Sequence, residues 1–222
     1  MGEVIRKTAA AVDILADLRT TLTNARARGG DWLTAAESRL GEVVALADGV
    51  EARLKTAETE AAPLAAALDV ENASADKLLG RVSDDIWNMV GRPGADPVLD
   101  ILFPGGFAFY ADGSTEEQPD RMTLLAELLR AGIHPRLTAE KAEAFAVEIG
   151  QAATRLEERV AAARPARARV KLAQRMQTTL ARHAQVALSR LKAQWKADGR
   201  TEAEIHAVIP RPSDPRRRRR RW

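Results

Sequence analysis

The fold class is decided by residues 31–70, DWLTAAESRLGEVVALADGVEARLKTAETEAAPLAAALDV. Alternating steps of three and four residues from Leu33 to Leu68 meet only apolar side chains. The positions are Leu33, Ala36, Leu40, Val43, Ala47, Val50, Leu54, Ala57, Ala61, Leu64 and Leu68. An apolar pattern sustained over about five heptads predicts a long helix with a coiled-coil seam. Pro63 lies within it and predicts either a kink or a break.

Two further segments have the same long-helix character. Residues 3–28 predict a first helix, which ends at Gly29-Gly30 and folds back on the second helix as an antiparallel hairpin. From residue 138 an apolar helical face returns and continues to Trp195, with an interruption expected at Pro165. Thr201 and Glu204 form a capping box that predicts one last short helix.

Residues 71–136 differ in style, because they hold five of the nine aromatic residues and most of the Pro-Gly punctuation. Ser74 predicts the cap of a helix over 75–91, and Asp96-Pro97 predicts the start of a short helix. Residues 107–110 predict a short strand followed by a turn, and residues 122–132 a further helix. This segment therefore reads as a compact insert with its own aromatic core.

The predicted fold is all-α: an elongated antiparallel helical bundle with a small, mostly helical, aromatic-rich insert. It divides into a long-helix hairpin (1–70), the insert (71–136), long helices that complete the bundle (137–199), and a short helix with a disordered Arg-rich tail (200–222). Aromatic residues are only 4% of the chain and Ala dominates the apolar set, which favours thin, close-packed helical seams.

Composition limits the possible functions. The chain has no cysteine, which excludes disulfides, thiolate metal sites and cysteine nucleophiles. The N-terminus is broken by charges, unlike a secretory signal, and no apolar run approaches the roughly 20 residues of a membrane span. These features predict a soluble, cytoplasmic protein.

The net charge of +3 conceals a strong asymmetry, because the last third of the chain is basic and ends in an arginine run. Such an arm attracts polyanions, and a terminal tryptophan can stack on a base. The residues concerned are Arg216, Arg217, Arg218, Arg219, Arg220, Arg221 and Trp222. The alternative is a solvated tail that has no dedicated partner or that neutralises the acidic half of the protein itself. Arg167, Arg169, Lys171 and Arg175 either extend this basic surface along a helix or form an ordinary wet face.

The aromatic insert is the other candidate region. Trp87, Phe103, Phe107, Phe109 and Tyr110 line either a pocket or partner surface, or the core of the small subdomain. Buried aromatics are the more common case, so the core is the favoured interpretation.

The remaining polar groups give weak signals. Glu202 and His206 lie one helical turn apart and form at most half a metal site, so no metal and no cofactor are predicted. An enzyme site around Asp84, Asp85, Tyr110 and His134 is a third, weaker hypothesis.

The leading functional hypothesis is a non-enzymatic structural or protein-interaction protein that presents helix faces or the insert to a protein partner or to itself. The alternative is a binder of nucleic acid or another polyanion that acts through the C-terminal arginine tail. A membrane-active helical bundle has no positive support in the sequence.

Overall fold

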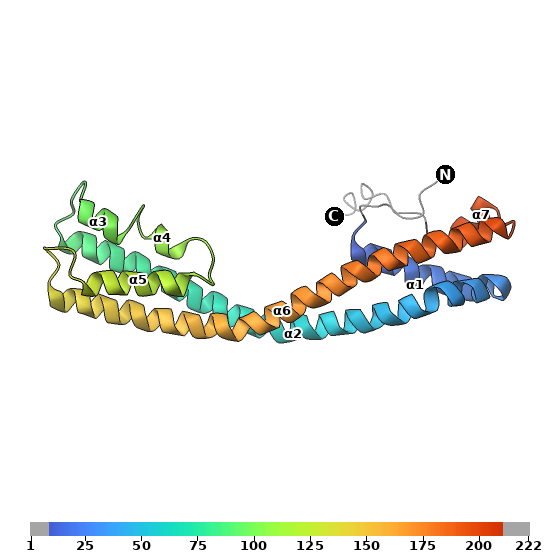
Figure 1. Cartoon of the computed structure of the whole chain (residues 1–222), viewed down its shortest axis with the longest axis horizontal. Helices are drawn as coiled ribbons and strands as arrows, with labels where there is room; N and C mark the ends of the chain where they lie inside the picture. Colours follow the sequence, from blue (N-terminus) through green and yellow to red (C-terminus); the bar gives the residue numbers. More distant parts are fainter. Residues whose placement is uncertain (1–8, 211–222) are drawn as a thin grey trace. The chain divides into compact units, whose positions relative to one another are not determined.

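The computed structural model describes residues 9–210, and the arginine tail lies outside these residues. The chain is an all-α helical bundle in which two very long helices, α2 and α6, pack against each other (Figure 1). It forms two compact units. Unit 1 comprises residues 1–57 and 169–222, and unit 2 comprises residues 58–168. No described helix has a stretch that is both long and apolar enough to cross a membrane.

The helical hairpin predicted at the N-terminal end is present. Helix α1 (Ala11–Arg28) ends at Gly29, whose positive φ of 70° favours glycine, and α2 (Gly30–Met89) follows at once. The predicted helix over 75–91 is not separate, since α2 runs unbroken through Ser74. The sequence after Pro63 is rich in Ala and has no further Pro before the end of α2, so the helix can continue through Ser74.

Both prolines that were expected to disturb the long helices lie inside them. Pro63 is within α2, and Pro165 is within α6 (Ala139–Ala197), so the interruption expected at Pro165 is wrong. Both prolines are exposed. A proline removes one backbone hydrogen bond, and water can satisfy the freed carbonyl when that side of the helix faces solvent.

In unit 1, α1 and α7 (Glu202–Val208) pack with the first half of α2 and the last part of α6. The buried side chains include Leu18, Leu40, Leu188 and Trp195. Helix α7 begins with the predicted capping box, in which Thr201 and Glu204 satisfy each other's backbone N–H groups.

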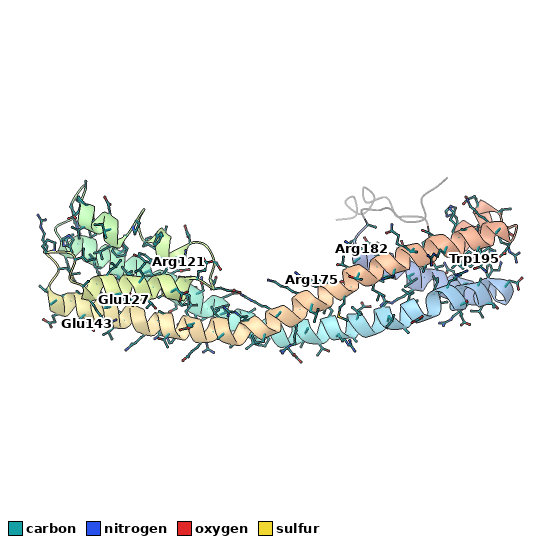
Figure 2. The ribbon with its side chains drawn as sticks, in the orientation of Figure 1. Arg121, Glu127, Glu143, Arg175, Arg182 and Trp195 are labelled. Carbon is teal, nitrogen blue, oxygen red and sulfur yellow. The ribbon has the colours of Figure 1, made fainter. Side chains whose placement is uncertain are left out.

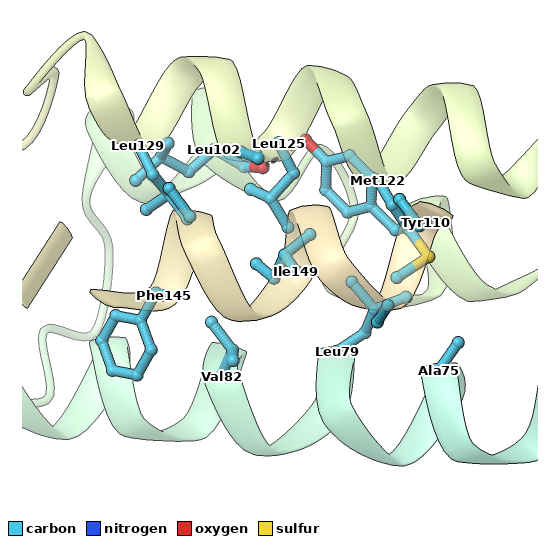
Figure 3. Close-up of a cluster of buried hydrophobic side chains, with 14 of the residues drawn as sticks. Ala75, Leu79, Val82, Leu102, Tyr110, Met122, Leu125, Leu129, Phe145 and Ile149 are labelled. Carbon is cyan, nitrogen blue, oxygen red and sulfur yellow. Dashed lines mark hydrogen bonds between the residues drawn. The ribbon is translucent and has the colours of Figure 1, made fainter. Parts of the chain in front are cut away.

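In unit 2, three short helices cover the packed α2–α6 pair: α3 (Pro97–Leu102), α4 (Ala108–Ala111) and α5 (Gln118–Arg130). Figure 3 shows Leu79, Met122, Leu125 and Ile149 meeting in their shared core. The predicted cap of α3 is confirmed, because the Asp96 carboxylate accepts hydrogen bonds from the Val98 and Leu99 amides.

The predicted strand at residues 107–110 is wrong, since this segment forms the single turn of α4. The Ala111 and Asp112 amides donate to the Phe107 and Ala108 carbonyls. A strand needs a neighbouring strand to satisfy its backbone, and the described residues contain none, whereas a helical turn satisfies its own groups.

The apolar pattern of residues 31–70 has the predicted orientation. None of its eleven positions is exposed: six are buried and five are half-buried. The apolar face predicted for the first part of α6 is also buried, at Ala142, Phe145, Ile149, Ala152, Leu156, Val160 and Ala163. Helix periodicity therefore identified the packed faces of both long helices.

Candidate polyanion-binding surface

The part of α6 that belongs to unit 1 has an unusual charge composition. Residues 169–197 carry seven Lys and Arg residues and no Asp or Glu. At the frequency of carboxylates in the whole chain, a helix of this length would carry about four. An ordinary solvated helix face mixes the two signs, so this stretch differs from the usual case.

Four of these cations share the solvent side of the helix. Lys171, Arg175, Arg182 and Arg190 are all exposed, and we call them the α6 cationic face. At 100° per residue they fall within an arc of about 100°, and they extend over about 28 Å of helix. Figure 2 shows Arg175 and Arg182 on α6, N-terminal to Trp195.

The opposite side of the same helix is packed. Leu180, Ala184, Leu188, Leu191 and Trp195 are buried in the core of unit 1. This packing fixes the rotation of α6 about its axis and holds the α6 cationic face towards solvent. The face is thus a fixed row of charges on a packed helix.

Within the described residues, no carboxylate forms an ion pair with the α6 cationic face. Four of the five carboxylates of α2 in this unit are bound by other elements: Asp48 lies 2.9 Å from Arg19 of α1, and Asp31 lies 3.6 Å from Arg200. Glu51 also pairs with Arg19, and Glu37 pairs with Arg26 at 3.5 Å. The acidic helix beside α6 therefore does not neutralise this face.

The two other lysines at the end of α6 share one carboxylate. Lys192 and Lys196 both bind Glu202 of α7, and their ammonium groups lower the pKa of Glu202 to about 2. Lys192 is itself buried. These lysines hold α7 on α6 and so have a structural role that the α6 cationic face lacks.

The row also has a cost. Lys171 and Arg175 are like charges at i and i+4, which destabilises a helix by about 0.2–0.5 kcal/mol. An external anion would remove this repulsion and gain charge-assisted hydrogen bonds from the guanidinium groups.

Only some of the basic residues that the sequence analysis singled out belong to this surface. Lys171 and Arg175 belong to it, whereas Arg167 lies in unit 2. Arg182 and Arg190 were missed, although the absence of carboxylates from residues 169–197 is a signal that sequence inspection can detect. The tail residues from Arg216 to Trp222 lie outside the described residues, and their predicted role stays a prediction.

The aromatic candidates of the insert divide into two groups. Phe103 and Tyr110 are buried in the core of unit 2, which the short helices share with α2 and α6, so they do not form a separate core of the insert. Trp87, Phe107 and Phe109 are exposed by 42–43%. The Phe107 ring lies over Gly80 of α2, and Trp87 is on the same side of that helix two turns later. These two rings therefore occupy one exposed surface.

The polar residues of the enzyme hypothesis have separate partners. His134 Nδ1 accepts from the Arg136 amide, so Nε2 carries the proton and donates to Asp96 at 3.1 Å. That hydrogen bond, with the two backbone bonds of the helix cap, lowers the pKa of Asp96. Tyr110 instead donates to the Leu102 carbonyl at 2.6 Å.

The hollow beside His134 is lined mainly by aliphatic side chains, including Leu102, Leu128 and Leu129. Asp85 pairs with Arg81, and Asp84 is exposed on α2. His134 thus joins the loop before α6 to the start of α3, and Tyr110 joins α4 to the end of α3.

At the end of unit 1, Trp32 and Trp195 pack with their ring centroids 4.6 Å apart, and both are buried. The guanidinium groups of Arg28 and Arg200 lie over the Trp32 ring. Glu202 Oε2 and His206 Nε2 are 3.3 Å apart, and among residues 9–210 no three His, Asp or Glu side chains converge as metal ligands.

Comparison of the chain with known protein families, curated proteins and solved structures finds no match. The fold defines a helical-bundle protein, and its function has to be argued from its own surfaces.

Proposed function

We propose that this protein is a non-enzymatic interaction protein that binds polyanions through the α6 cationic face. The observation that carries the proposal is the row of four exposed cations on a packed helix with no carboxylate between residues 169 and 197. Binding then releases counterions from the polyanion, is strongly weakened by salt, and does not depend on sequence. The C-terminal arginine run adds to the same attraction, as the sequence predicts.

The test is a matched pair of triple variants in the full chain, with heparin as a generic polyanion. Lys171→Gln, Arg175→Gln and Arg182→Gln together remove three charges of the face. Lys77→Gln, Arg130→Gln and Lys141→Gln remove three exposed charges from unit 2. All six side chains are exposed, so both proteins should retain the circular dichroism of the parent.

We expect the α6 triple variant to lose at least tenfold in heparin affinity at low salt, and the unit 2 variant to lose less than threefold. A chain that ends at Pro210 separates the contribution of the arm. Equal losses in the two triple variants would show that only net charge matters. If only the shortened chain loses heparin binding, the C-terminal arm and not the α6 cationic face binds the polyanion.

A second candidate function is protein contact through unit 2, and the exposure of Trp87 and Phe107 on one surface supports it. Sedimentation equilibrium over a hundredfold range of concentration tests whether the partner is a second copy. We expect Trp87→Gln with Phe107→Gln to abolish any concentration-dependent increase in mass. A parent chain that stays monomeric over that range contradicts self-association.

A further inference from the structure

We propose that the ligand of the α6 cationic face is double-stranded nucleic acid, held by its phosphate backbone. This inference rests on the proposed polyanion binding and names the class of polyanion. It follows from the length and the side-chain chemistry of the row. It also follows from the burial of the aromatic rings and of the apolar helix face in the described part of unit 1.

Residues 9–57 and 169–210 of unit 1 offer no stacking platform for single strands. Proteins that bind single strands combine a basic groove with exposed aromatic rings on which bases stack. Within the described part of unit 1 the aromatic residues are Trp32 and Trp195, and both are buried against each other. A duplex keeps its bases stacked internally and presents its phosphates on the outside, where cations alone can bind them.

A membrane surface fits less well. A helix that lies on a bilayer inserts a continuous apolar face and keeps its cations on the opposite side. In α6 the continuous apolar face is buried in the core of unit 1. The exposed aliphatic side chains of this stretch are Leu172 and Val186, which are isolated from each other along the helix. The outward side of α6 is thus cationic without an apolar anchor.

The dimensions of the row suit a rigid linear polyanion. About 28 Å of helix corresponds to about eight base pairs at 3.4 Å each. Three of the four residues are arginines, whose planar guanidinium groups can donate two hydrogen bonds to one phosphate. Because the row is held by the packed core, its charges do not have to be gathered from a flexible chain when the ligand binds.

The experiment compares four probes at one ionic strength: a 24-base-pair DNA duplex, the single strand of the same length, heparin, and vesicles of phosphatidylserine and phosphatidylcholine. Fluorescence anisotropy gives the affinities of the nucleic acids, and a salt series gives the slope of log K against log salt. The proteins are the parent chain, the α6 triple variant, the matched unit 2 variant, and Arg175→Lys with Arg182→Lys.

We expect the duplex to bind at least tenfold more tightly than the single strand. Each lost phosphate contact reduces the salt slope by about 0.9, so the α6 triple variant should reduce it by about 3. The unit 2 variant should leave the slope within about one unit of the parent value. The variant with Arg175→Lys and Arg182→Lys should retain most of the duplex affinity, because it keeps both positive charges at the same positions of α6.

Binding of heparin without preference for the duplex over the single strand overturns the inference and leaves the proposed function standing. Vesicle binding that the α6 triple variant abolishes, with no duplex binding, assigns the face to a membrane surface and also overturns it. Binding of none of the four probes overturns both the inference and the proposed function.

Discussion

The hydroxyl group of Tyr110 is the most direct point at which the packing of unit 2 can be tested. Tyr110 is fully buried and donates a hydrogen bond of 2.6 Å to the Leu102 carbonyl at the end of α3, as Figure 3 shows. Its ring packs edge-on against Phe103 and Phe109, with centroids 6.0 and 5.0 Å apart. One side chain therefore joins α4 to α3 and to the α2–α6 core beneath them.

Tyr110→Phe removes this hydroxyl and keeps the ring. The hydrogen bond is lost, and the Leu102 carbonyl stays in a buried site without that donor. Loss of one partner of a buried hydrogen bond costs about 1–3 kcal/mol. The equilibrium constant for unfolding of unit 2 should therefore rise roughly five- to 150-fold. Phe109→Leu is the control, because it changes a ring contact and leaves the hydroxyl bond intact.

Urea unfolding, with hydrogen exchange of the α3 and α4 amides, measures this change within unit 2. Alkaline titration gives a second readout, since Tyr110 is the only tyrosine in the chain. Burial raises the pKa of Tyr110 above its usual value of 10. Because the folded-state pKa is the higher one, the stabilisation is complete below about pH 10 and is lost as the pH rises through the folded-state value. Tyr110→Phe should remove this alkaline loss.

Two results would refute this reasoning. A stability of Tyr110→Phe within about 0.3 kcal/mol of the parent would mean that the hydroxyl bond makes no net contribution. A tyrosine that ionises near pH 10 while α3 and α4 are still protected from exchange would mean that Tyr110 is not buried in the folded protein.

Further predictions concern helix continuity and acid stability. Gly80→Ala should stabilise α2 by up to about 1 kcal/mol in urea unfolding, because the new Cβ would lie 3.9 Å from the Phe107 ring, an ordinary contact; destabilisation would show that the ring is closer. Pro63→Ala should stabilise the same helix by about 1–3 kcal/mol, because it restores a backbone hydrogen bond and removes a clash; an unchanged urea midpoint contradicts this. Glu202 has a folded-state pKa of about 2, lowered chiefly by its hydrogen bond to Lys196 and below the ordinary 4.5, so its contribution is present above pH 4.5 and disappears towards pH 2. Glu202→Gln should reduce the dependence of the thermal midpoint on pH in that interval, and an unchanged slope argues against the pairing.

The fold could be predicted wherever periodicity reports on packing. The three–four spacing from Leu33 to Leu68 located a buried face, and Asp96-Pro97 and Thr201 located two helix starts by local capping chemistry. The prediction failed where the outcome depends on groups distant in sequence. Whether the exposed Pro165 ends a helix depends on which side of α6 faces solvent, and residues 107–110 became a helical turn because the described residues contain no strand to pair with them.

The candidate surface was predictable only in part, for a related reason. Sequence shows that cations follow one another, and Lys171 and Arg175 were identified in this way. It does not show which cations are already paired. Lys192 is as basic as Arg182 in the sequence, but the fold buries it against Glu202 of α7. The two classes of cation separate only once α7 is placed beside α6.

The two long helices carry opposite net charges, but the cations of α6 are placed differently in the two units. Helix α2 carries 12 carboxylates against five cations, and α6 carries 12 cations against five carboxylates. If this complementarity served only the pairing of the two helices, the cations of α6 would lie along the α2 contact. In unit 2 some do so, since Arg155 of α6 bonds to Glu71 of α2 at 3.1 Å. In unit 1 the α6 cationic face points away from the core, and four of the five α2 carboxylates are bound by Arg19, Arg26 and Arg200. Charge pairing within the bundle therefore accounts for contacts in unit 2 and does not extend to the outward row of unit 1.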